Sequence, residues 1–397
     1  MKLIEVNDEK TREEFLSVPK ILYRDDPNWI CPLDMEIENT FNPLKNKGFK
    51  HGGAIRWILK DETGNLAGRI AAFFDEHKAY QNKQPTGGIG FFECINSQEA
   101  ADMMFNAAKE WLTGKGMQAM DGPINFGENF VNWGLLVEGF MPQTYGMPYN
   151  FPYYRELFEK YGFRVYFNQF SFLDDFSKPY PERMRKFGEH FWSKPEYTFR
   201  HIELKNAEKY LRDLVVMYNA IWADFLESYT PLEFDDLYQI FKDAKSILNE
   251  KFIWFAYDNG SPIGFLIVFP DVNQVLKKLG NGKMSFINIL KFLFYRRRAV
   301  TRGRLLLSGM LPEYQRKGVV GGIYLKLTDS MRENGMEALD LSWVGDYNIT
   351  VNRMYAQFGA IKEKTHTTYR YLFDPDAEFV RFSNLSSKTA RIAKNIE

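Results

Sequence analysis

Several segments of this sequence recur in the same order in its two halves. ETGNLAGRIAAFFD resembles DNGSPIGFLIVFPD, and LIEV near the start resembles HIEL in the middle of the chain. LFEKYGFRVYFNQFSF and MYAQFGAIKEKTHTTYRY align Gly162 with Gly359. The three pairs keep nearly the same separation, as expected for a repeated structural unit. We therefore predict a duplicated domain.

A fourth pair, GKGMQAMD and ENGMEALD, lies further apart than the others. The C-terminal half must then carry an insertion before this motif, and the N-terminal half a compensating insertion after it. We place the insertions at residues 272–304 and 122–152.

The chain of 397 residues is long enough for two or three domains of about 150 residues. We predict one domain at residues 1–178, a linker at 179–198, a second domain at 199–382 and a polar tail at 383–397. FIWFAYDNGSPIGFLIVF predicts a hairpin, because turn residues separate two β-branched and aromatic runs. RLLLSGML, VGGIYLKLTDSMREN and ALDLSWV then predict a strand, a helix and a parallel strand. Each half is therefore predicted to be α+β.

Composition excludes several classes of function. Lysine plus arginine and aspartate plus glutamate each number 51, so we expect no nucleic-acid partner. Cys31 and Cys94 show no ligand spacing, and the five histidines are scattered singly, so we predict neither a disulfide nor a metal site. No signal peptide and no membrane span are indicated, which predicts a cytoplasmic protein.

The segment LPEYQRKGVVGGIY, residues 311–324, lies between a predicted strand and a predicted helix. Backbone N–H groups of such a loop can bind an anion, helped by the helix dipole. Gly318 allows backbone conformations closed to other residues. Two interpretations stay open: a phosphate-binding loop, or a turn whose glycines ease helix packing. The nucleotide-binding patterns GxxxxGK[ST] and GxGxxG are both missing.

This segment resembles the GNAT superfamily of acyl-CoA-dependent N-acetyltransferases, in which a strand is followed by Q/R-x-x-G-x-G/A and a helix. Val320 stands where that pattern has glycine or alanine. The resemblance implies two tandem domains with mixed, mostly antiparallel central sheets flanked by helices. It also implies that the loop binds acetyl-CoA or another acyl-CoA. The residues implied in this contact are Met310, Leu311, Gln315, Arg316, Lys317, Gly318, Val319, Val320, Gly321 and Gly322.

DYNITVNRMYAQFGA resembles the second signature of the family, an asparagine followed by a helix with a tyrosine seven residues later. The resemblance implies that Asn348 helps to hold the pantetheine arm and that Tyr355 is the general acid for the CoA thiolate. A phenol with a pKa near 10 can protonate a thiolate whose conjugate acid has a pKa of about 8.5. The alternative for Tyr355 is an ordinary aromatic residue on the buried face of a helix.

The N-terminal half departs from this pattern. CINSQEAADMMF replaces the loop without a glycine or a basic residue, and Phe158 occupies the position of Tyr355. We predict that this half keeps the fold and has lost CoA binding. Tandem GNAT-like domains also occur in Fem-type transferases, which makes aminoacyl-tRNA an alternative donor.

The residues that would contact the acceptor amine are less clearly indicated by the sequence than those that would bind CoA. The carboxylates near the predicted cleft are Asp340, Glu313, Glu227 and Glu233. Trp222, Phe225 and Tyr229 have helical spacing that fits either a cleft wall or a core stripe, and we favour the core stripe. We expect residues 122–152 to cover the cleft, because loops longer than about 15 residues are usually functional or disordered and this one is rich in aromatics.

FINILKFLFYRRR fits an amphipathic lid, a dimer face or a membrane-surface helix. We expect its aromatics to pack on the sheet, with residues 296–298 solvated or near the CoA phosphates.

The leading hypothesis is an acyltransferase that moves an acetyl or other short acyl group from CoA to the primary amine of a small molecule or peptide. A non-catalytic binding protein with the same duplicated fold is the alternative. The acceptor, the acyl length and the oligomeric state stay open.

Overall fold

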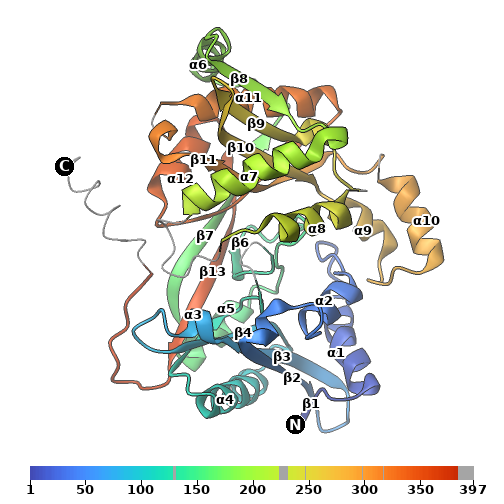
Figure 1. Ribbon diagram of the computed structural model, residues 1–397. Coiled ribbons are helices and arrows are strands. Elements are labelled where there is room, and N and C mark those ends of the chain that lie inside the picture. The colour runs from blue at the N-terminus through green and yellow to red at the C-terminus, as the bar shows by residue number, and fades with distance from the viewer. Residues whose placement is uncertain (128–130, 223–230, 246, 297, 316, 383–397) are drawn as a thin grey trace.

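The computed structural model describes residues 1–127, 131–222, 231–245, 247–296, 298–315 and 317–382. In this part of the chain the strands form one mixed 13-stranded sheet, and helices cover both of its faces (Figure 1). Most neighbouring strands are antiparallel. The predicted α+β class with a mostly antiparallel sheet is confirmed.

The two halves contain matching elements in the same order. The N-terminal half contains β1 (Lys2–Glu5), α1 (Glu9–Leu22), α2 (Asp34–Thr40), β2 (Gly52–Lys60), β3 (Leu66–Asp75), α3 (Glu76–Ala79), β4 (Thr86–Cys94), α4 (Gln98–Gly114), β5 (Ala119–Gly122), β6 (Leu135–Glu138), α5 (Tyr154–Tyr161) and β7 (Arg164–Asp175). After α6 (Glu182–Trp192), the C-terminal half contains β8 (Tyr197–His201), α7 (Ala207–Trp222), α8 (Phe234–Ala244), β9 (Ile253–Asp258), β10 (Ser261–Pro270), α9 (Asn273–Leu279), α10 (Phe286–Tyr295), β11 (Arg302–Met310), α11 (Val319–Glu333), β12 (Ala338–Gly345), α12 (Ile349–Gln357) and β13 (Ile361–Leu372). The two predicted insertions hold β6 in the first half and α9 with α10 in the second.

The predicted hairpin is formed by β9 and β10. Its turn places Asn259 at φ 46° and Gly260 at φ 84°. Two consecutive residues with positive φ give a turn whose twist matches that of the flanking strands, and Asn-Gly is the preferred pair for it.

The two halves exchange their last strands, which the sequence did not predict. The sheet order is β1-β2-β3-β4-β5-β13-β7-β12-β11-β10-β9-β8. Strand β13 of the C-terminal half therefore lies between β5 and β7, and β7 of the N-terminal half lies between β13 and β12. Figure 1 shows these two long strands running through the middle of the molecule. Neither half has a complete sheet by itself, so the predicted boundary at residue 178 divides the sequence and not the structural units.

The hydrophobic cores show the same exchange. The core beneath α4 in the N-terminal half includes Tyr369 from β13. The core beneath α11 in the C-terminal half includes Phe172 from β7. Each closing strand therefore contributes buried apolar area, the main source of folding free energy, to the other half.

Two predictions about connecting segments are corrected. Residues 179–198 were predicted to be a linker, yet they contain α6, which packs against α11. The aromatic side chains of α10 were expected to pack on the sheet. Phe286 and Phe294 are exposed instead, as are the aliphatic side chains of this helix, and the residue that it buries is Asn288.

Candidate active site

Strands β11 and β12 pair only near their first residues. Their parallel ladder is three residue pairs long, from Arg302 with Ala338 to Arg304 with Asp340. Beyond it, β11 continues along β10 as far as Met310, while β12 continues along β7. The two strands separate toward their carboxyl ends. Backbone groups facing such a gap can hydrogen-bond an extended ligand as they would an added strand.

The loop after β11 leads to the amino end of α11. A 3₁₀ turn, Pro312–Tyr314, follows the strand, and Gly318 precedes the helix with φ 82°. Gly318 is the N-cap residue, and it has no side chain that could accept a hydrogen bond from the first turn of α11. The first N–H groups of an uncapped helix lack intrahelical partners and lie at the positive end of the helix dipole. The amino end of α11 can therefore bind an anion beside the gap.

The side chains of this loop have local partners. Gln315 donates from Nε2 to the carbonyl oxygen of Met310 at 3.1 Å. The ammonium group of Lys317 lies 4.3 Å from the ring centroid of Tyr314. Arg316 lies outside the described residues. Gln315 therefore ties the loop back to the end of β11.

The glycines at the start of α11 make room for aromatic side chains. A Cβ added at Gly318 would lie 2.1 Å from Cζ of Phe187 on α6. A Cβ at Gly322 would lie 2.9 Å from Cζ of Phe199 on β8. These contacts favour the packing interpretation for the two glycines, and they leave the backbone N–H groups as the part of the loop that can bind an anion.

We expect Gly318→Ala to lower the free energy of unfolding by about 2–4 kcal/mol, because alanine is strained at positive φ and its Cβ would collide with Phe187. Urea denaturation measures this loss. Gly335→Ala is a matched control, since Gly335 has φ 77° and open space around its Cβ position. It should lose only the strain, about 1–2 kcal/mol. Equal losses in the two variants would show that the ring of Phe187 moves aside without cost.

Tyr355 lies on the buried face of α12 and reaches β11. It is 5% exposed, and its ring packs edge-on against Phe172 with centroids 5.6 Å apart. Burial raises the pKa of Tyr355 to about 12; a hydrogen bond with Ser308 acts in the opposite direction, and the charge of Asp340 adds to the increase. The phenol is therefore neutral near pH 7 and carries a proton to donate. Its partner Ser308 belongs to the strand that lines the gap.

Asn348 occupies the N-cap position of the same helix. Its side-chain oxygen accepts a hydrogen bond from the backbone N–H of Val351 at 3.2 Å. A cap of this kind typically stabilises a helix by about 1 kcal/mol. Asn348 thus fixes the start of the helix that carries Tyr355, and its amide nitrogen is the group that can donate to a ligand.

Residues 214–360 match the model of the acetyltransferase (GNAT) family. The chain contains a GNAT domain. The matched residues include β11, the loop, α11, β12 and α12, and therefore every element of the candidate site described above.

Two proteins resemble nearly the whole of this chain. Protein YghO of Escherichia coli (strain K12) is 26% identical over 362 residues, which cover 89% of this chain and 91% of that protein. The bacterial ceramide synthase of Caulobacter vibrioides (strain NA1000 / CB15N) is 26% identical over 383 residues, which cover 93% of this chain and 97% of that protein.

A solved structure has the same tandem arrangement. It is a tandem GNAT protein from the clavulanic acid biosynthesis pathway, with a TM-score of 0.54 and 9% identity, covering 95% of this chain and 99% of that one. At this identity the likeness concerns the fold alone. It confirms a tandem GNAT fold over 95% of this chain.

The N-terminal GNAT-like half lacks both features of the candidate site. At the amino end of α4, Ser97 caps the helix and accepts a hydrogen bond from the backbone N–H of Ala100 at 3.3 Å. Phe158, which corresponds to Tyr355, is fully buried against Phe92 and Phe105. These differences support the prediction that this half does not bind CoA, which stays a prediction.

The first insertion lies against the base of the gap in the C-terminal half. The backbone N–H of Tyr145 donates to Asp271 at 2.9 Å, and Arg304 donates to the carbonyl oxygen of Tyr145 at 2.6 Å. Thr144 donates to the buried carboxylate of Asp340. Thr144 and Tyr145 therefore hold the insertion on β11, on β12 and on Asp271, the residue that follows β10. Its role as a cover for the acceptor cleft stays a prediction.

Sequence reasoning missed His366, which lies on β13 near Asp340. Its Nε2 lies 3.1 Å from the carbonyl oxygen of Pro148, which can only accept, so Nδ1 carries the lone pair. Burial lowers the pKa of His366 to about 4, so the ring is neutral near pH 7. Nothing in the local sequence identifies His366, because its burial depends on the strand exchange and on the first insertion.

The other predicted acceptor-side residues give little support for a cleft wall. Three of them lie outside the described residues: Phe225, Glu227 and Tyr229. Trp222 stacks on Tyr218 with ring centroids 4.6 Å apart and packs on the core beneath α7, as a core stripe should. Glu233 and Glu313 are exposed.

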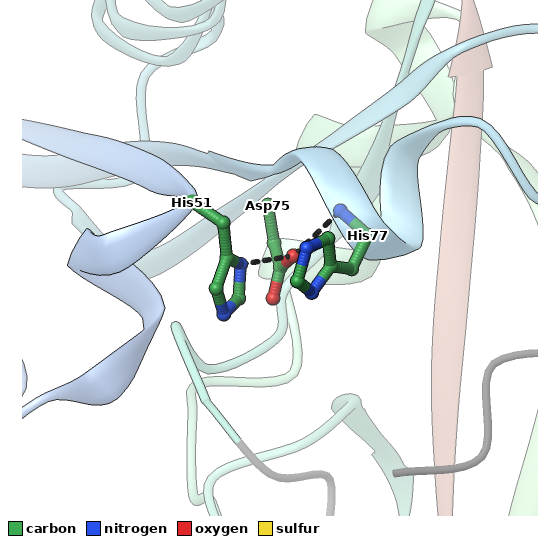
Figure 2. A group of neighbouring side chains, drawn as sticks. All are labelled: His51, Asp75 and His77. Carbon is green, nitrogen blue, oxygen red and sulfur yellow. Dashed lines mark hydrogen bonds and ion pairs between the residues drawn. The ribbon is translucent and has the colours of Figure 1, made fainter.

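His51, Asp75 and His77 lie together at the end of β3 (Figure 2). Asp75 Oδ1 lies 2.8 Å from His51 Nδ1 and accepts the backbone N–H of His77 at 3.0 Å. The two rings stack with centroids 4.0 Å apart and an interplanar angle of 13°. Each imidazole lone pair lies in its own ring plane, so two parallel rings do not direct both lone pairs at one ion. The sequence predicted isolated histidines, and this prediction is wrong for His51 and His77. The absence of a metal site stays a prediction.

Proposed function

We propose that this chain transfers an acyl group from acyl-CoA to a primary amine. The observation that carries the proposal is the position of Tyr355, a buried neutral phenol whose pKa is influenced by Ser308 of β11, the strand that lines the gap between β11 and β12. The amino end of α11 lies at the carboxyl end of that same strand. An anion-binding group, a gap for an extended arm and a proton donor therefore follow one another along one short stretch of chain.

The residues present fit an acyl-CoA. The first backbone N–H groups of α11, apart from that of Gly321, which donates to the carbonyl oxygen of Gly318 at 2.9 Å, would hold the pyrophosphate. Backbone groups along the gap would hold the pantetheine arm, together with the amide nitrogen of Asn348. The thioester supplies the activated acyl group. Tyr355 would donate its proton toward the sulfur as negative charge develops there, which general acids typically accelerate by 10²- to 10⁴-fold.

The similarity to the bacterial ceramide synthase guides the choice of the first amine to test. A ceramide is an N-acylated long-chain amino alcohol, and the similarity extends over nearly all of both chains. We therefore place a long-chain amino alcohol first in the acceptor panel, ahead of short amines and peptides, and test long-chain acyl-CoA beside acetyl-CoA.

We expect an acyl-CoA to raise the midpoint of thermal unfolding, because a ligand at 100 times its Kd stabilises the native state by about 2.7 kcal/mol. Release of free CoA in the presence of each amine then measures turnover. Stabilisation without turnover on any amine would favour the non-catalytic alternative. Neither stabilisation nor turnover with any thioester would contradict the proposed donor, and turnover with aminoacyl-tRNA would replace it.

A further inference from the structure

Helix α10 presents its apolar side chains to solvent. The six large apolar residues on its surface are 41% to 75% exposed: Phe286, Ile287, Ile289, Leu290, Leu293 and Phe294. The residue that it buries is Asn288, whose amide donates to Asn281 Oδ1 at 2.9 Å and to the carbonyl oxygen of Lys283 at 2.7 Å. A surface helix of a soluble protein normally has the opposite arrangement. A contiguous exposed apolar face of this kind indicates an interaction surface.

The segment that contains α10 is strongly basic. Between Asp271 and Arg302 the sequence has seven lysine and arginine residues and neither aspartate nor glutamate, in a chain whose charges balance overall. Lys283 and Lys291 are exposed beside the apolar face, and Arg298 follows it. The partner of this surface should therefore be both apolar and anionic.

The helix is held in place. The backbone N–H of Asp34 on α2 donates to the carbonyl oxygen of Gly282 at 3.0 Å, just before α10 begins. Asp34 also pairs with Lys20 at 2.6 Å. Figure 1 shows α10 at the outer edge of the molecule, beside α9. The segment before α10 is therefore fixed to α2, and the apolar face of α10 points away from this contact.

A cavity of about 720 Å³ lies beside α9 and the end of α10. Its walls include Lys277 and Lys278 from α9, Tyr295 and Arg298 from the end of α10, and, on the side of the sheet, the carboxylates Glu337 and Glu363. Lysine and arginine side chains are the usual partners of phosphate groups. Cationic groups thus lie next to the exposed apolar face, as they would beside lipid headgroups.

We propose that α10 inserts its apolar face into the surface of an anionic membrane, lying parallel to the bilayer plane. No helix in the described ranges is long and apolar enough to cross a bilayer, and helices that combine an apolar face with lysine and arginine bind in the interface. A second copy of the chain is a poorer occupant, because a two-fold contact would bring two such basic segments together. The inference does not depend on the proposed acyl transfer.

Flotation of the full-length protein with vesicles tests this proposal without any acyl-CoA. We expect binding to vesicles of 30% phosphatidylglycerol in phosphatidylcholine, and weaker binding to pure phosphatidylcholine and at high salt. The triple variant Phe286→Ser, Leu290→Ser, Phe294→Ser should reduce binding at least tenfold. Replacing Lys283 and Lys291 by glutamine should reduce binding about fivefold per charge.

A control variant removes exposed apolar residues elsewhere on the molecule, through Val216→Ser, Ile240→Ser and Leu44→Ser. It should bind vesicles as the wild type does, and all variants should keep the wild-type unfolding midpoint. Wild-type protein that does not bind the anionic vesicles, or a triple serine variant that binds them equally well, would overturn the proposal. A dimer in solution that the triple serine variant dissociates would also overturn it, in favour of a second copy as the occupant.

Discussion

Replacing Tyr355 by phenylalanine is expected to lower kcat for acyl transfer by about 10²- to 10³-fold, with little change in the affinity for acyl-CoA. Phenylalanine keeps the packing against Phe172 and removes only the hydroxyl group. A loss confined to kcat would identify an interaction made in the transition state. Steady-state rates and thermal shifts with acyl-CoA, measured on the same preparation, separate the two effects.

A matched control is Tyr314→Phe, in the loop before α11. The hydroxyl of Tyr314 donates to Asp258 at 2.7 Å, on the hairpin and away from the gap, so its removal should leave kcat nearly unchanged. The pH profile gives a second check. Because the pKa of Tyr355 is raised to about 12, its acid form persists through pH 9, and no loss of activity below that pH should come from its titration. Wild-type kcat in the Tyr355→Phe variant would exclude Tyr355 as the acid.

The duplication could be predicted from sequence because its evidence is local. Glycines that end helices, such as Gly162 and Gly359 with φ 109° and 89°, need positive φ and so persist at matching positions in both halves. The hairpin at Asn259 and Gly260 and the strand-helix-strand order after β10 are also encoded in short segments. The loop before α11 and the position of Tyr355 on a helix could be predicted from these same short segments.

The strand exchange could not be predicted in this way. β7 and β13 have similar alternating patterns, and either could close the sheet of its own half or that of the other half. The choice depends on contacts between residues far apart in sequence, such as Gln169 with His366 in the β7–β13 ladder. The site residues that depend on this exchange, among them His366 and its contact with Pro148, were therefore missed.

The exposure of α10 was missed for a related reason. Hydrophobic residues in a short segment predict burial, because most apolar side chains in soluble proteins contact a core. The sequence does not show that Asn288 is the residue facing inward. The basic residues around this helix were the available signal, since an ordinary core helix seldom lies in a segment that has seven basic residues and no acidic ones.

The strand exchange also gives the N-terminal half, which lacks the features of the candidate site, a structural role in that site. Strand β13 follows directly after α12, the helix that carries Tyr355, and the N-terminal half holds that strand through β5, β6 and β7. A buried polar link joins the cross-strand neighbours Asp121 of β5 and Arg370 of β13 through two hydrogen bonds of 2.6 and 2.7 Å. Arg370 is 5% exposed, and its guanidinium lies 3.6 Å from the ring centroid of Tyr166. Asp121, which aligns with Asp340 in the repeated motif GKGMQAMD and ENGMEALD, thus has a structural function.

Asp121→Ala should therefore lower the free energy of unfolding by about 3–5 kcal/mol, because it leaves the buried charge of Arg370 without its carboxylate. Denaturant unfolding measures the loss. The matched control is Glu156→Ala, which removes an exposed ion pair with Lys160 and should cost less than about 1 kcal/mol. Adding Arg370→Met to Asp121→Ala should restore much of the lost stability, since an apolar side chain leaves no unpaired charge. A loss below 1 kcal/mol in Asp121→Ala would mean that backbone pairing and apolar packing alone hold β13 in the N-terminal half.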